Sequence, residues 1–237
     1  VQLSGNWVTL LWILEAALLF TIGRIRSTPP YEKLAYPLIV ISFFSQVHDW
    51  SGMELSAGSL DPVNEFTPVF NINFLSALLF VTSLAVILIT YLNKKYISPF
   101  KDKTGIKGLL DYGLPALFIL LVYLTFQTEI VSYYNNLFAR SGTDFRFSGL
   151  NMTSEPGLTI SRMRTLWLVN YSLLFFAALS LANALKIRQR ILGIASFWLN
   201  LIAILTFLFL SLYILSEMRE SFIGSTSSEE ITHKGYS

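Results

Sequence analysis

Apolar stretches long enough to form membrane helices alternate with short polar stretches along most of the chain. A helix needs about 20 mostly apolar residues to cross the hydrocarbon core of a bilayer. Six segments meet that requirement: Trp7–Gly23, Leu34–Asp49, Phe74–Leu92, Leu109–Tyr133, Leu166–Leu185 and Ile191–Ser216. The pattern therefore predicts an all-α fold, a polytopic membrane bundle of six transmembrane helices within residues 1–220, followed by a polar, loosely ordered tail at 221–237.

Two of these segments carry residues that interrupt the apolar pattern. The second is short, and it contains Pro37 near its start and the polar residues Ser42 and Ser45 further along. The fourth contains Pro115, and a proline is tolerated in the first turn of a helix, where its missing amide hydrogen has no partner to lose. If the regular part of the fourth helix begins near Tyr112 or Gly113, Pro115 lies in its first turn.

Basic residues are concentrated in alternate connecting segments, and this sets the expected orientation. Arg24–Lys33, Asn93–Gly108 and Lys186–Arg190 together hold eleven of the seventeen Lys and Arg residues, whereas most acidic residues lie in the other connections. Loops rich in Lys and Arg stay on the cytoplasmic side of a membrane. We therefore expect both termini outside, a basic cytoplasmic loop at 93–108, and two outer loops at 50–73 and 135–161.

Composition excludes several classes of protein. Hydrophobic residues make up 53% of the 237 residues, charged residues only 14%, and mean hydropathy is +0.55, whereas an average soluble domain is about 25% charged. A chain without cysteine has no disulfide or thiolate site, and two histidines make a histidine-rich metal site improbable. A net charge of +2 gives no sign of nucleic-acid binding. No cofactor motif is present, so no cofactor is expected. The apolar composition makes the lipid bilayer and further transmembrane helices the expected partners.

The first apolar segment resembles a recurrent segment of the large bacterial predicted membrane proteins grouped as domain of unknown function 2339. In that family a Trp precedes a Trp-x-x-Glu-Ala helix that ends in Gly-Arg. The matching stretches of this chain are Leu3–Trp7, Trp12–Arg24, Arg164–Tyr171 and Leu215–Ser221. Members of that family are long, many-spanning proteins, so the resemblance implies one portion of a larger protein of the bacterial inner membrane and cell envelope. A first helix preceded by only a few residues agrees with that expectation.

Glu15 is an ionisable residue in the middle of the first predicted helix, eight residues after Trp7. That spacing places it about 12 Å along the helix axis. A carboxylate near bilayer depth costs about 2.5–3.5 kcal/mol unless it is paired, protonated or facing a cavity. One interpretation is a group that handles a proton or a ligand. The other, which we favour, is a hydrogen bond to a neighbouring helix, with Asn170, Ser180 and Asn200 as candidate partners.

Charged residues of both signs lie at the predicted outer ends of the second, fourth, fifth and sixth helices. They define a candidate outer polar cluster: His48, Asp49, Glu129, Arg162, Arg164, Glu217, Arg219 and Glu220. Because desolvation makes an unpaired charge costly, we expect the arginines to meet carboxylates in a packed bundle. The first contacts expected are Arg162 or Arg164 with Glu129 or Glu217, and Asp49 is expected to join them.

Two interpretations of the outer polar cluster stay open. The cluster could bind a sugar, a phosphate or a cation, or supply the carboxylate base of an outer-leaflet enzyme that acts on lipid-linked or glycan substrates. Alternatively, its ion pairs hold helix ends together, and the chain is a structural or transport-related portion of a larger multi-pass protein. We favour the second interpretation because no catalytic motif is present.

Overall fold

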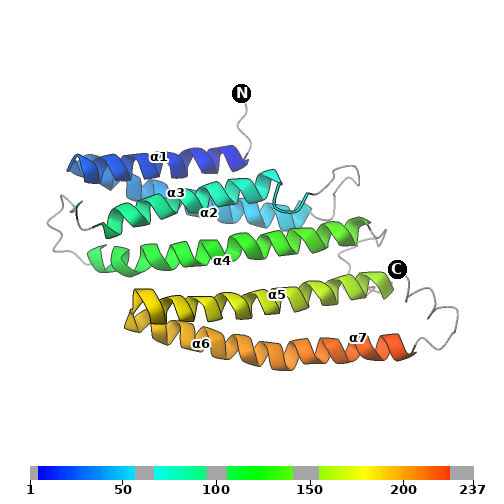
Figure 1. Cartoon of the computed structure of the whole chain (residues 1–237). Helices are drawn as coiled ribbons and strands as arrows, with labels where there is room; N and C mark the ends of the chain where they lie inside the picture. The colour runs from blue at the N-terminus through cyan, green and yellow to red at the C-terminus, as the bar shows by residue number, and fades with distance from the viewer. Residues whose placement is uncertain (1–4, 57–66, 94, 96–105, 141–154, 225–237) are drawn as a thin grey trace. The chain divides into compact units, whose positions relative to one another are not determined.

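The computed structural model describes residues 5–56, 67–93, 95, 106–140 and 155–224, and every regular element in these ranges is a helix (Figure 1). The chain forms two compact units, Val1–Asn136 and Leu137–Ser237, and each is described by itself below. The all-α fold class is therefore confirmed. A single bundle of all six predicted helices would involve both units together, and it stays a prediction.

The first unit is built from three long helices and all but the last turn of a fourth. These are α1 (Gly5–Ile25), α2 (Pro29–Ser56), α3 (Ile72–Leu92) and α4 (Ile106–Arg140). α1 and α2 pack along each other as a hairpin, and α3 packs against α1 (Figure 1). Side chains at the start of α1 contact the end of the apolar part of α2, and side chains at the end of α1 contact the end of α3. Neighbouring helices in the chain therefore run in opposite directions.

The turn between α1 and α2 is only three residues long, at 26–28. The backbone N–H of Thr28 donates to the carbonyl of Gly23 at 2.9 Å, and Ser27 adopts a left-handed conformation with φ of 53°. This is the arrangement that ends many helices, because it satisfies a carbonyl of the last turn. Pro29 then opens α2, where a proline costs no hydrogen bond. The turn fixes α1 and α2 as a tight antiparallel pair.

The core of the first unit lies along one face of each helix. On α1 the buried positions Ile13, Ala16, Ala17 and Phe20 recur at helical spacing, and they pack with buried residues of the other three helices. The opposite face of α1 is also apolar but exposed, with Leu11 55% and Leu18 58% accessible. A helix that is apolar on all sides is typical of a membrane span.

The second unit is a helical hairpin with two π-helical turns. α5 (Glu155–Ala182) continues into the π-helix η2 (Asn183–Ile187). After a short turn, α6 (Arg190–Thr206), the π-helix η3 (Phe207–Ser211) and α7 (Leu212–Gly224) follow one another as a nearly continuous rod. In the turn, the side chain of Asn183 accepts from the backbone N–H of Gln189 at 3.0 Å, and it donates to the carbonyl of the same residue at 3.2 Å.

Five helical stretches in the described residues are long and apolar enough to cross a membrane. They are Trp7–Ile25, Ile72–Leu92, Leu110–Phe138, Leu158–Ile187 and Arg190–Glu220. They coincide with five of the six segments expected from the sequence. The second segment forms the long helix α2, which is not among the five because Pro37, Ser42, Ser45 and Gln46 interrupt its apolar pattern. These five stretches support the expectation of a multi-pass membrane protein.

The helices extend beyond the apolar segments, and this corrects several expected boundaries. α2 continues to Ser56, α4 runs from Ile106 to Arg140, α5 begins at Glu155 and α7 ends at Gly224. Parts of the expected loops 50–73, 93–108 and 135–161, and the first residues of the expected tail, are therefore helical. Polar residues end an apolar run without ending a helix, which is why the pattern placed these boundaries too early. The remaining parts of those loops lie largely outside the described residues.

The position of Pro115 is a second correction. Because α4 begins at Ile106, this proline lies inside the helix and not in its first turn. The polar start of α4 hid these additional helical turns from an analysis based on apolar residues.

Candidate functional site

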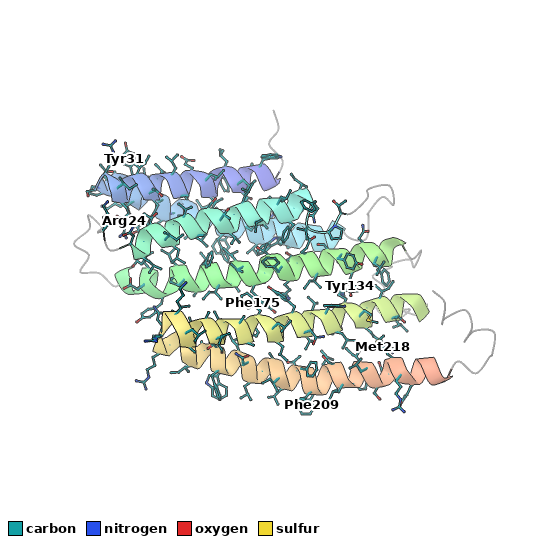
Figure 2. All side chains as sticks on the ribbon, viewed as in Figure 1. Arg24, Tyr31, Tyr134, Phe175, Phe209 and Met218 are labelled. Carbon is teal, nitrogen blue, oxygen red and sulfur yellow. The ribbon has the colours of Figure 1, made fainter. Side chains whose placement is uncertain are left out.

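The most deeply buried charges of the first unit lie where α1 leads into α2 (Figure 2). The Nε of Arg24 donates to Oε1 of Glu32 at 2.8 Å, with side-chain exposures of 6% and 0%. The hydroxyl of Tyr36 donates to the same oxygen at 2.8 Å. Glu32 and Tyr36 are one helical turn apart on α2, so their side chains project from the same face. This carboxylate therefore joins α1 to α2 through a cation and a hydroxyl.

Aromatic rings enclose the guanidinium group of Arg24. Its Cζ lies 5.2 Å from the ring centre of Phe20 on α1 and 5.0 Å from that of Tyr91 on α3, within the range of cation–π attraction. The hydroxyl of Tyr91 in turn donates a hydrogen bond to Oδ1 of Asp111 on α4. We call Arg24, Glu32, Tyr36, Tyr91 and Asp111 the Arg24 cluster. It connects all four helices of the first unit at one end.

Gly23 permits the close approach on which the Arg24 cluster depends. A Cβ at this position would lie 2.7 Å from the backbone nitrogen of Glu32 and 3.2 Å from its Cα. Real Cβ atoms do not come so close to a backbone nitrogen. The two backbones can therefore meet here only because residue 23 has no side chain.

Asp49 belongs to a second polar contact, at the opposite end of the α1–α2 hairpin. The hydroxyl of Thr9 on α1 donates to Oδ2 of Asp49 at 2.7 Å and lies 2.6 Å from the hydroxyl of Ser45. Ser45 and Asp49 occupy one face of α2, as their spacing predicts, and that face is turned toward α1. His48, the next residue of the candidate outer polar cluster, is exposed. Asp49 is therefore bonded to α1, whereas His48, its neighbour in the sequence, is exposed.

Glu129 of α4 holds the segment that precedes α3. Its Oε1 accepts from the backbone N–H of Val69 at 2.8 Å and from Nδ2 of Asn71 at 2.9 Å, and Oε2 lies 3.0 Å from the same Nδ2. Asn71 also caps α3, because its Oδ1 accepts from the backbone N–H of Phe74 at 2.8 Å. Val69 has a φ of 69°, an unfavourable region for a β-branched residue. The carboxylate stabilises this strained turn.

Glu217 forms an ion pair in the second unit. Nη2 of Arg162 on α5 lies 2.9 Å from Oε2 of Glu217 on α7, and the hydroxyl of Tyr213 donates to the other carboxylate oxygen at 2.7 Å. Arg162 with Glu217 is one of the pairs expected from the sequence. Arg219 and Glu220, from the same candidate cluster, are exposed, and Arg164 is partly buried with interactions of its own.

Within each unit, members of the candidate outer polar cluster make local contacts. Asp49 and Glu129 contact residues of the first unit, whereas Arg162 and Glu217 contact each other in the second. The expectation that all of these residues meet in one cluster concerns both units and stays a prediction. Within the described part of the chain, no group of three or more His, Asp or Glu side chains is placed to hold a metal ion.

Glu15 is exposed on α1, and within the first unit no described residue donates a hydrogen bond to its carboxyl group or forms an ion pair with it. A contact with Asn170, Ser180 or Asn200 would join the two units, and it stays a prediction. The amide nitrogen of Asn200, one of its expected partners, donates within the second unit, to the carbonyl of Phe176 and the hydroxyl of Ser180, each at 2.9 Å. Asn170, another expected partner, is exposed on α5. Asn200 and Ser180 are therefore partners of each other, joining α6 to α5.

The Arg24 cluster was not predicted, because Arg24 and Glu32 lie in a segment, Arg24–Lys33, that the charge pattern indicates only as a basic cytoplasmic connection. A signal was present. Gly23 directly precedes Arg24, Pro29 and Pro30 mark a very short turn, and Glu32 follows three residues after the first proline. A short turn brings the end of one helix beside the start of the next, so opposite charges on either side of it are expected to meet.

Comparison with protein-family models, with curated proteins and with solved structures found no match.

Proposed function

We propose that this chain is a membrane-embedded helical portion, structural or transport-related, of a larger multi-pass protein of the bacterial cell envelope. Its five apolar spans support the membrane setting. The concentration of Lys and Arg in alternate connections supports an orientation with the basic turns in the cytoplasm and both termini outside. The resemblance of Trp12–Arg24 to domain of unknown function 2339 supports the bacterial inner membrane as the setting.

The state of three carboxylates favours this function over an outer-leaflet enzyme. A carboxylate that acts as a base or nucleophile must be able to reach a substrate. Asp49 accepts from Thr9, Glu129 accepts from a backbone N–H and an amide, and Glu217 accepts from Arg162 and a tyrosine. Each carboxylate joins one helix to another helix or to the turn that leads into it. This is the arrangement of structural ties.

Neutral substitutions test the two functions against each other. We expect Asp49→Asn, Glu129→Gln and Glu217→Gln each to lower the free energy of unfolding in detergent by about 1–3 kcal/mol, because each weakens charge-assisted hydrogen bonds to its partners. Replacing a catalytic group usually leaves stability unchanged or raises it, because active sites are built at a cost in stability. Unchanged or higher stability in all three variants would therefore contradict the structural function.

Glu220→Gln is the matched control. Glu220 lies one turn or less from Glu217 on α7 and is exposed. Its neutralisation removes a similar charge from the same helix, and we expect a change within about 0.5 kcal/mol.

A further inference from the structure

The exposed face of α1 combines an apolar stripe with a carboxylate. Leu11, Leu14, Leu18 and Ile22 are 55%, 52%, 58% and 39% exposed, and Glu15 is exposed among them. The stripe follows the three- and four-residue spacing by which one helix packs against another. The opposite face of α1 is already occupied by the core of the first unit. In a membrane, the stripe therefore faces either lipid or another helix.

Glu15 lies near the middle of this span. It is eight residues from Trp7 and ten from Ile25, which is about 12 Å and about 15 Å along the axis. At either end of the span a carboxylate can reach water, but at this depth it contacts the hydrocarbon core. An unpaired carboxylate there costs about 2.5–3.5 kcal/mol on insertion scales. Ionisable side chains at this depth almost always pair with one another or face a water-filled cavity.

We propose that this face of α1 binds a transmembrane helix from outside these 237 residues, and that the partner helix carries an Arg or Lys at mid-membrane depth opposite Glu15. Charge complementarity selects a basic partner, because an opposite charge lets the carboxylate remain ionised, and an Arg can pair with both of its oxygens at once. The leucines on either side supply the packing surface that surrounds the ion pair.

The sequence indicates why the base comes from another helix. Within the five apolar spans, the Lys and Arg residues lie toward the ends: Arg24, Lys186, Arg190 and Arg219 are at most one residue from a span end, and Arg162 and Arg164 are four and six residues from the start of Leu158–Ile187. A second copy of the chain would bring the same arrangement of charges and no base at mid-depth. The complementary residue must therefore belong to a different membrane helix.

Synthetic transmembrane peptides of about 20 Leu and Ala residues provide the probe. One peptide has a single central Arg, and its matched control has Leu at that position. Energy transfer between labelled peptide and labelled chain in phosphatidylcholine vesicles reports association. We expect the Arg peptide to bind the chain about tenfold more tightly than the Leu peptide, as one polar contact between membrane helices allows. Glu15→Gln and Glu15→Leu are expected to abolish that difference.

A relocated carboxylate tests whether the face itself matters. Leu79 is 52% exposed near the middle of α3, so Glu15→Leu combined with Leu79→Glu keeps one exposed mid-helix carboxylate. We expect this double variant not to recover binding of the Arg peptide. Equal binding by the double variant would show that any exposed carboxylate suffices, and it would overturn the assignment of a docking face on α1. Association of the chain with itself through Glu15 would overturn the proposed partner.

This inference rests on the proposed membrane setting, and one measurement separates the two. A Leu18→Cys variant in the same vesicles is expected to resist a water-soluble thiol reagent until detergent is added. If Leu18→Cys reacts freely in intact vesicles, α1 does not span the bilayer and both proposals fail. If it is protected and the Arg peptide binds no better than the Leu peptide, the membrane setting stands and the partner proposal fails.

Discussion

The Nε of Arg24 lies 2.8 Å from Oε1 of Glu32, and both side chains are almost completely buried. The two residues are only eight positions apart, yet they belong to different helices, because a three-residue turn reverses the chain between them. A buried ion pair adds little net stability compared with an apolar pair, but loss of one partner is strongly destabilising. The pair therefore specifies how α1 and α2 meet.

Removing one member of this pair is expected to be more harmful than removing both. Arg24→Leu and Glu32→Leu each leave an uncompensated buried charge, which costs about 3–5 kcal/mol. The double variant leaves no charge and should recover most of that loss. Unfolding in mixed micelles with increasing SDS would measure all three free energies. Additive losses in the double variant would contradict a direct interaction between the two side chains.

Arg26→Gln is the control for that cycle. Arg26 lies in the same turn but is exposed. Its replacement should change the free energy of unfolding by no more than about 0.5 kcal/mol.

Gly23→Ala is expected to destabilise the hairpin of α1 and α2. The new Cβ would lie 2.7 Å from the backbone nitrogen of Glu32, so one helix must move. Overpacking of this kind costs about 1–3 kcal/mol. The shift would also lengthen the contact between Arg24 and Glu32. The same SDS titration measures the loss.

Gly108→Ala is the matched control for the glycine substitution. Nothing lies within 4 Å of a Cβ built at Gly108 on α4. Because Ala favours helix over Gly by up to about 1 kcal/mol, this variant should be as stable as the parent or more stable. If both glycine variants behave alike, close helix approach at residue 23 is not the reason for its glycine.

Asn200 is expected to stabilise the packing of α6 on α5. Its Nδ2 donates to the carbonyl of Phe176 and the hydroxyl of Ser180, each at 2.9 Å, and to the carbonyl of Ser196 at 2.7 Å. Asn200→Leu should lower the free energy of unfolding by about 1–2 kcal/mol, the range for a polar contact between membrane helices. Asn170→Leu, at an exposed position on α5, should have little effect. An equal loss in both variants would argue against a specific role for Asn200.

The sequence predicted the helices well, because a membrane span is encoded locally by an unbroken apolar run such as the one from Phe74 to Leu92. It also indicated that Ser45 and Asp49 share a face, since helical periodicity fixes that relationship. It did not predict that Thr9 binds both, nor that Glu129 binds the backbone of Val69, sixty residues away. Such contacts depend on how separate helices align, and no short-range periodicity records that alignment.

The candidate site shows the same division between local and long-range information. The ion pair of Arg162 with Glu217 followed from opposite charges at neighbouring helix ends. The Arg24 cluster did not, because the charge pattern of Arg24–Lys33 indicates orientation and not contact between helices. Burial of Glu32 depends on Gly23 and on the tight turn, and the contribution of those residues is steric and not electrostatic.

The most direct test of the membrane-embedded account is cysteine accessibility in intact bacterial cells. The chain has no native cysteine, so each variant carries a single thiol. Four exposed positions serve as reporters: Ser51 and Glu220 at the predicted outer ends, and Lys95 and Lys186 at the predicted cytoplasmic ends. With an impermeant thiol reagent added outside, Ser51→Cys and Glu220→Cys should react at once. Lys95→Cys and Lys186→Cys should react only after the membrane is permeabilised. The reverse pattern would overturn the orientation, and equal labelling of all four in intact cells would contradict a chain that spans the membrane.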